Sequence, residues 1–107
     1  MGRLRRRLSD ETPNEAPLIG LPGNDLIAAG VSDLRAGRIT QASLLVTIGA
    51  PRLRRVGVDL PATLPANPEH ALYELLAEDD PDSAHSRYNA LIRRLVSFER
   101  AAECVSR

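Results

Sequence analysis

The clearest hydrophobic pattern lies in the last quarter of the chain, where apolar residues recur at alternating steps of four and three. The seam consists of Ala84, Tyr88, Leu91, Leu95, Phe98, Ala102 and Val105. Ile92 and Val96 widen it. Because such spacing places side chains on one face of a helix, the pattern predicts a long C-terminal helix, capped by Asp82 and running to about Val105.

Shorter apolar periods predict two helices in the first half of the chain. One begins at Asn24, a good N-cap residue, and ends at Gly37. Gly30 lies inside it and is expected to permit a close contact with another helix. The next is capped by Thr40 and ends at Gly49.

Prolines mark the start of two further elements. Pro51 suits the first turn of a short helix that ends at Arg55, and residues 58–67 are expected to be an extended loop. Asn67 followed by Pro68 predicts the start of another helix. Since no segment alternates with the period of a half-buried strand, we expect an all-α fold, a small bundle of four to five helices.

The first 22 residues differ in composition from the rest of the chain. The run Arg3–Arg7 contains four arginines and is followed by polar residues and prolines. Such a segment buries little apolar surface, so we expect a flexible, disordered basic tail over residues 1–22. Residues 23–107 are then expected to form a single helical domain, which suits a chain of 107 residues.

Composition narrows the classes of protein that the chain can belong to. Hydrophobic residues make up 43%, aromatic residues only 3%, and the formal net charge is zero. No overall field therefore attracts the chain to nucleic acid or to a membrane. The single cysteine gives no sign of an oxidising compartment, and no apolar run approaches the length of a membrane span. We expect a cytoplasmic protein with no membrane contact.

Residues of the types that commonly act in catalysis are few in this sequence, and they are far apart. His70 and His85 each lie in the first turn of a predicted helix. His85 and Cys104 are separated by about 28 Å along one helix, too far for a nucleophile and its base. The spacings of zinc, calcium and nucleotide-binding motifs are absent from the sequence. We therefore expect no enzyme, no metal and no cofactor, and leave as an alternative an enzyme assembled across subunits around His85.

Residues 40–49 resemble the first helix and turn of many helix-turn-helix regulators, with Thr-Gln, then apolar residues, then Gly. The resemblance implies a recognition helix that begins with basic residues able to contact DNA. The candidates are Arg52, Arg54 and Arg55. The resemblance covers ten residues, and its second half departs from the pattern. Arg55 falls where an aliphatic residue is usual, and Gly57 ends the helix early.

The leading hypothesis is a non-enzymatic protein-interaction module that uses its C-terminal helix to bind another protein or a second copy of itself. Small bacterial proteins of this build often act as antitoxins, adaptors or regulators. The predicted contact residues are the apolar Leu91, Leu95 and Phe98 and a rim of Arg87, Arg93, Arg94 and Arg100. Two alternatives stay open. The seam can instead be the core of the monomer, and residues 40–56 can belong to a DNA-binding regulator that dimerises through the last helix.

Overall fold

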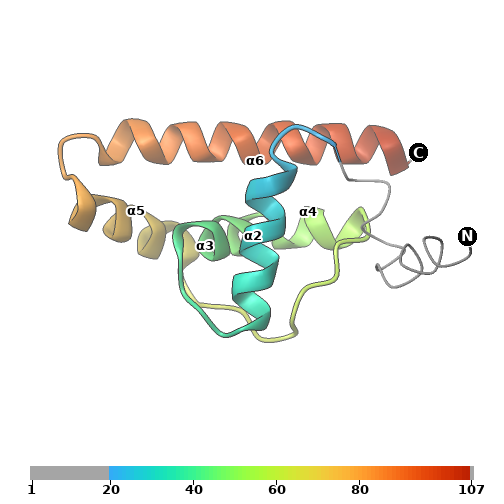
Figure 1. The fold of residues 1–107 in the computed structure, drawn as a ribbon, viewed down its shortest axis with the longest axis horizontal. Coiled ribbons are helices and arrows are strands. Elements are labelled where there is room, and N and C mark those ends of the chain that lie inside the picture. Colours follow the sequence, from blue (N-terminus) through green and yellow to red (C-terminus); the bar gives the residue numbers. More distant parts are fainter. Residues whose placement is uncertain (1–19, 107) are drawn as a thin grey trace, which may run out of the picture.

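The computed structural model describes residues 20–106, and within this range the chain forms five helices and no strand (Figure 1). The helices are α2 (Asn24–Arg35), α3 (Gln41–Ile48), α4 (Ala50–Arg55), α5 (Pro68–Asp79) and α6 (Ala84–Ser106). The predicted all-α fold with a long C-terminal helix is confirmed. Of the predicted tail, residues 1–19 lie outside the described residues.

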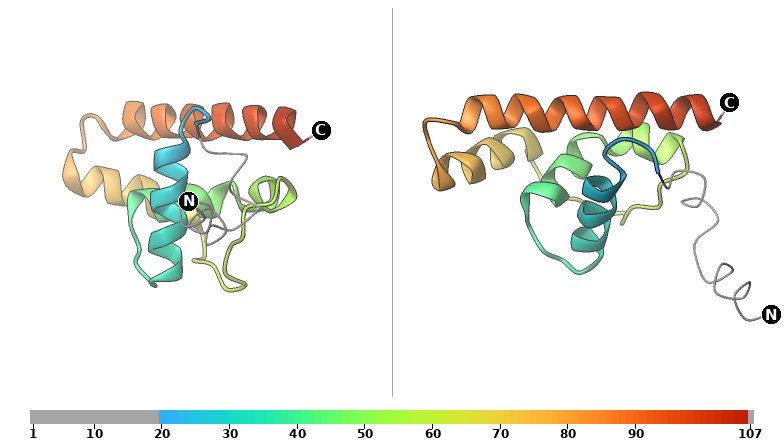
Figure 2. Two further views of the ribbon diagram at one scale, coloured as in Figure 1. Left: turned by 45° about the vertical axis from the view of Figure 1, so that its right-hand side comes forward. Right: turned by 45° about the horizontal axis from the view of Figure 1, so that its top comes forward.

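The long helix α6 runs along one side of the molecule and the other helices pack against it (Figure 1). In Figure 1, α5 lies beneath the first half of α6, α4 beneath the second half, and α3 between them. Helix α2 stands across this layer, as the two further views also show (Figure 2). No helix in residues 20–106 is both long and apolar enough to cross a membrane.

Helix α3 is the centre of the core, since five consecutive residues, Ser43 to Thr47, are buried. A helix that is buried on every side must satisfy its polar side chains internally. The hydroxyl of Thr47 does so by donating to the backbone carbonyl of Ser43 at 2.8 Å. The hydroxyl of Ser43 likewise donates to the backbone carbonyl of Thr40 at 3.1 Å, and the other buried positions, Leu44, Leu45 and Val46, are apolar, so the helix can be enclosed by α2, α5 and α6.

The start of α3 is tied to the end of α2 by a small polar cluster. The Thr40 hydroxyl oxygen accepts from the backbone N–H of Ser43 at 3.1 Å, which confirms Thr40 as the N-cap. The same hydroxyl donates to the carboxylate of Asp33 at 2.7 Å, and Arg38 donates to that carboxylate at 2.9 Å. These bonds, the one from Thr40 first, hold the pKa of Asp33 below its ordinary value.

The predicted N-cap of α2 is wrong by one residue. The cap is Gly23, with φ of 80°, and Asn24 is already helical. The backbone of Gly23 lies against the C-terminal helix, and a Cβ on this residue would be 3.2 Å from the carbonyl oxygen of Arg94. Close approach and a left-handed conformation together favour glycine over the side-chain cap that Asn24 would provide.

The predicted start of the last helix also shifts by one residue: with Asp82 as N-cap the helix would begin at Ser83, and it begins at Ala84. The turn before it is organised by Asp80, whose carboxylate accepts from the backbone N–H of Asp82 at 3.2 Å and from the Ser83 hydroxyl at 2.8 Å. Asp82 therefore belongs to the turn. The start of α5 agrees better, because Asn67 is the N-cap and Pro68 the first helical residue, although Asn67 makes no side-chain cap.

The heptad seam of α6 mainly faces the chain's own core. Its buried members are Ala84, Leu95, Phe98 and Ala102. Tyr88 and Leu91 are half-buried against the same core, whereas Val105 is 47% exposed. For most of its length, the seam therefore builds the monomer, as one of the two alternatives from the sequence expected.

The contact between α2 and α3 depends on Gly30. A Cβ placed on Gly30 would overlap the backbone carbonyl oxygen of Ala42 and lie 2.5 Å from Cγ2 of Val46. The absence of a side chain lets the two helices approach backbone to backbone, as the sequence led us to expect.

We expect Gly30→Ala to lower the free energy of unfolding. Overpacking costs about 1–3 kcal/mol, which exceeds the gain of about 1 kcal/mol in helix propensity over glycine. Urea unfolding of the two proteins measures the difference. Ser32→Ala, at an exposed position of the same helix, is the control and should be neutral or slightly stabilising. A Gly30→Ala protein more stable than the wild type would contradict this account.

Candidate docking groove beside the C-terminal helix

A groove lies where α3 and α4 meet α6. Its apolar lining comes mainly from Ile48 and Pro51 on one side and from Ile92 and Val96 on the other, and its volume is about 300 Å³. We call it the docking groove. Ile48, Ile92 and Val96 are half-buried and Pro51 is exposed, so the groove is apolar surface that the described helices leave partly uncovered.

Gly49 forms the corner of the docking groove, between α3 and α4. A Cβ at this position would lie 2.6 Å from Oε2 of Glu99 and 2.8 Å from Cδ1 of Leu95. A larger residue would therefore require the ends of the Leu95 and Glu99 side chains to shift. The φ of Gly49, −89°, is an ordinary one.

An ion-pair cluster closes the end of the docking groove and fastens α4 to α6. Nη1 of Arg52 lies 2.9 Å from Oε1 of Glu99, whose side chain is buried, with the residue 3% exposed. Arg52 also donates to both carboxylate oxygens of Glu103, each at 3.0 Å. One guanidinium therefore bridges two carboxylates one turn apart on α6.

Burial dominates the electrostatics of this cluster. Loss of solvent raises the pKa of Glu99, and the nearby charge of Arg52 opposes that rise only in part. The hydrogen bonds to Glu103 raise the pKa of Arg52, which stays charged. The cluster therefore contains a carboxylate that is costly to bury, held by a permanent cation.

This cluster changes the interpretation of the arginines considered for DNA binding. Arg52 is engaged by α6, and Nη2 of Arg54 donates to the backbone carbonyl of Pro61 at 2.7 Å. Arg55 is exposed. Helix α4 follows α3 directly at Gly49, so two helices joined by a glycine are present. However, α4 has only six residues, which is fewer than two turns.

The residues predicted to bind a partner separate into three groups. Phe98 is buried in the core and Leu91 is half-buried against it, whereas Leu95, buried in the core, also lines the docking groove. The second group forms ion pairs within the chain. Nη1 of Arg87 lies 2.7 Å from Oδ2 of Asp79, and Nη2 of Arg94 lies 3.7 Å from Oδ1 of Asp25.

Arg93 and Arg100 form the third group. Both are exposed and neither forms an ion pair with another residue in the range 20–106. Both arginines neighbour Val96 on the surface of α6, because Arg93 lies three residues before it and Arg100 four residues after it, and side chains at these spacings are neighbours on a helix. The residues that widen the seam, Ile92 and Val96, are half-buried, whereas Leu95 and Phe98 of the seam are buried.

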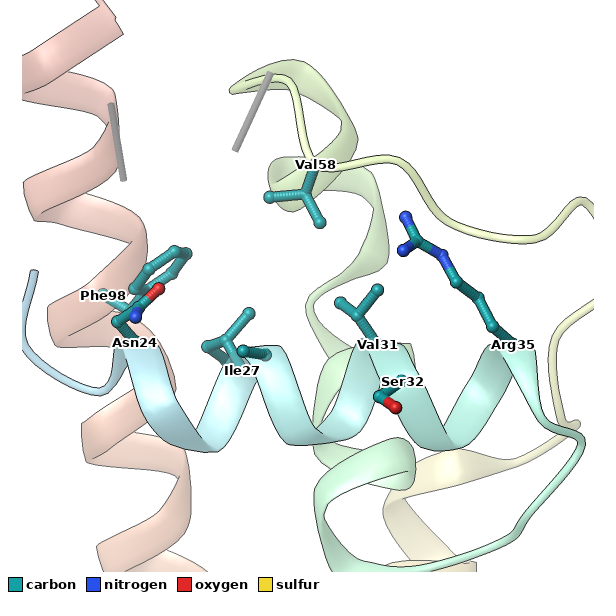
Figure 3. Close-up of a pocket in the computed structure, with 8 residues that line it drawn as sticks. Asn24, Ile27, Val31, Ser32, Arg35, Val58 and Phe98 are labelled. Atoms are coloured by element: carbon teal, nitrogen blue, oxygen red, sulfur yellow. The ribbon is translucent and has the colours of Figure 1, made fainter. Parts of the chain in front are cut away.

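A second concavity lies between α2, α6 and the loop after α4 (Figure 3). Ile27, Val31, Val58 and Phe98 form its apolar walls, and its volume is about 180 Å³. Arg35 is the charged residue of its lining, and its guanidinium donates to the backbone carbonyl of Asp59 at 3.0 Å. The one charged side chain of this lining is thus already bound within the chain.

The groups that were considered for catalysis lie apart. Nε2 of His70 is 3.1 Å from the carboxylate of Glu74, and His85 contacts the side-chain amide of Asn89 at 3.2 Å. Cys104 is exposed near the end of α6. Among residues 20–106, no group of three or more potential ligands is arranged to hold a metal ion.

Comparisons with protein-family models, curated proteins and solved structures find no match to this chain. Its function must therefore be inferred from its own residues and their geometry.

Because the pKa of Glu99 is raised in the folded chain, the folded state holds its proton at pH values where the unfolded chain has released it. The free energy of unfolding should then fall as pH rises from the ordinary value of 4.5 through the raised pKa. We expect Glu99→Gln to flatten this part of the pH profile, measured by urea unfolding across a pH series. Glu78→Gln, which removes an exposed carboxylate, is the charge-matched control. An unchanged slope in Glu99→Gln would contradict the assignment.

Proposed function

We propose that this chain is a non-enzymatic protein-interaction module, in which the docking groove beside α6 receives a segment of a protein chain. The observation that carries the proposal is a partly uncovered apolar groove flanked by arginines that have no ion pair among the described residues. Apolar centres with polar rims are the usual build of protein interfaces.

The shape of the docking groove favours a helix as its occupant. Ile92 and Val96 are four residues apart on α6 and present two neighbouring apolar positions about 6 Å apart along the axis. Ile48 and Pro51 complete the opposite wall. An amphipathic helix with its own apolar pair at the same spacing would pack into such a groove.

The charges around the docking groove favour an acidic partner. Arg93 and Arg100 lie along the α6 edge, and Arg55 lies one turn after Pro51 on the α4 edge. Three cations around one apolar surface would attract carboxylates and oppose basic partners. Adaptor, antitoxin and regulator roles all fit such a module, and we propose the cytoplasm as its location.

DNA binding through residues 40–56 is the second candidate, since α3 and α4 do meet at a glycine as in the resemblance. It is less favoured because Arg52 and Arg54 are engaged within the chain. A mobility-shift experiment with random duplex at low salt separates the two. Binding that weakens steeply with salt and disappears in Arg54→Ala/Arg55→Ala would support the regulator instead.

For the interaction module, we expect Val96→Asp to weaken partner capture about tenfold or more. The reason is that loss of a buried interface anchor costs roughly 2 kcal/mol, and the new carboxylate would be desolvated. Ser97→Asp, which adds the same charge at an exposed neighbouring position, is the control. Proteins retained from an extract of the native host are quantified for the wild type and both variants.

A protein retained by the wild type and by Ser97→Asp but lost with Val96→Asp would support the docking groove. Thermal unfolding followed by circular dichroism checks that all three chains remain folded. Identical retention by three folded proteins would remove the groove as the contact surface.

A further inference from the structure

The concavity between α2, α6 and the loop after α4, which we call the α2 concavity, is open along one side of α2 (Figure 3). Its four apolar wall residues are each at most 5% exposed. Its rim on α2 is exposed and consists of residues at steps of four and three, Ala28, Ser32 and Arg35. The α2 concavity is therefore a notch in the surface of the core that a further apolar segment would fill.

The chain that precedes α2 is directed toward the α2 concavity. The backbone N–H of Asn24 donates to the carbonyl of Leu21 at 3.0 Å, which closes a turn and reverses the chain. Gly23 permits this turn with a φ of 80°, and Leu21 packs against the core. In Figures 1 and 2 the chain enters α2 from the side on which α4 lies. The residues before the turn therefore lead back along α2.

The segment that comes before this turn has the composition of an occupant. Leu18 and Ile19 form an aliphatic pair directly before Gly20, and a carboxylate, Glu15, precedes them. Pro17 favours an extended chain, because the residue before a proline avoids the helical conformation. The segment lies outside the described residues, and its sequence combines apolar bulk near the turn with negative charge farther away.

The length of the segment matches the length of the α2 concavity. From Asn24, beside the turn, to Arg35, at the far end, α2 rises about 16 Å. An extended chain of six residues, from Leu21 back to Glu15, reaches at most about 20 Å. The carboxylate can therefore reach Arg35 while the aliphatic pair lies over the apolar middle.

The charge at the far end also matches. Arg35 lines the α2 concavity, and its side chain is 44% exposed although it donates to the carbonyl of Asp59. A guanidinium has five N–H donors, so Arg35 can bind a carboxylate in addition to Asp59. Length, apolar bulk and charge thus agree on one register for the segment along α2.

We infer that residues 15–19 of this chain occupy the α2 concavity. Leu18 and Ile19 fill its apolar middle, and Glu15 binds Arg35 at its far end. The helical domain then begins earlier than the sequence predicts, and the α2 concavity is part of the core of the chain and not a site for a separate ligand. The docking groove beside α6 plays no part in this inference, which stands or fails independently of the proposed function.

The first test is nuclear magnetic resonance of the full chain. Phe98 is the only phenylalanine in the sequence and lines the α2 concavity, so selective labelling identifies its ring protons. We expect nuclear Overhauser contacts from the methyl groups of Leu18 or Ile19 to this ring, unchanged on dilution because they lie within one chain. Random-coil methyl shifts and no contact to Phe98 would overturn the inference, as would contacts that disappear on dilution.

The second test measures stability in the full chain. Leu18→Ala/Ile19→Ala should raise the unfolding equilibrium constant about tenfold or more, because two aliphatic side chains lose buried surface. Leu4→Ala/Leu8→Ala makes the same kind of change in the same N-terminal segment but outside residues 15–19, and it should leave stability unaltered. Urea unfolding followed by circular dichroism compares the variants with the wild type. Equal midpoints for all three proteins would contradict the inference.

The third test examines the register through its charges. Glu15→Arg and Arg35→Glu should each lower the urea midpoint, and the double variant should be more stable than the sum of the two effects predicts, since the pair is restored with opposite sign. Glu11→Arg combined with Arg35→Glu is the matched control and should show additive effects. Additivity in the Glu15 cycle as well would overturn the placement of the segment along α2.

Discussion

The packing of α6 onto the Gly49 corner, fastened by Arg52 between Glu99 and Glu103, is the interaction on which the rest of the arrangement depends. The hydrogen bonds of this cluster join residues that are up to 51 positions apart in the sequence, Arg52 on α4 and Glu103 on α6. Of the three charged residues only Glu99 is buried, whereas Arg52 and Glu103 are partly exposed, so the cluster adds little net stability. Together with the buried seam residues Leu95, Phe98 and Ala102, it holds α6 in the orientation that decides which of its residues remain at the surface.

The docking groove is a consequence of that position. With Glu99 held at the corner, Leu95 and Phe98 turn into the core, while Ile92 and Val96 lie at its edge beside Ile48. A rotation of α6 about its axis would have buried Val96 and exposed Phe98 instead. The same orientation of α6 thus accounts for both its buried seam and the uncovered apolar strip, and the proposed interaction surface depends on it.

The sequence pattern predicts the helices well because their signals are local. Thr40 with Ser43, and Pro68 after Asn67, each act within one turn, and the heptad seam identifies α6. The start of α2 is missed because Gly23 is chosen by its contact with Arg94, far away in the chain.

The candidate site is predicted less well because its contacts join residues that are far apart in the sequence. Arg52 is predicted to contact DNA because no residue near it in the sequence indicates that its partners lie on the last helix. A signal was present, however, in the spacing of Glu99 and Glu103, one turn apart and at the edge of an apolar seam. A carboxylate in that place requires a cation from another element.

With few aromatic residues, the chain reaches a dense interior through close approach of its helices. Gly30 brings the backbone of α2 onto that of Ala42, and Gly49 lets the side chains of Leu95 and Glu99 on α6 come close to the end of α3. Small residues at such crossings let the helices approach closely, so the interior is densely packed without the large aromatic side chains that fill space in other small proteins. Because the nearest neighbour of Gly30 is backbone, that crossing leaves little tolerance for added volume, and one of the smallest residues is among the least replaceable in the molecule.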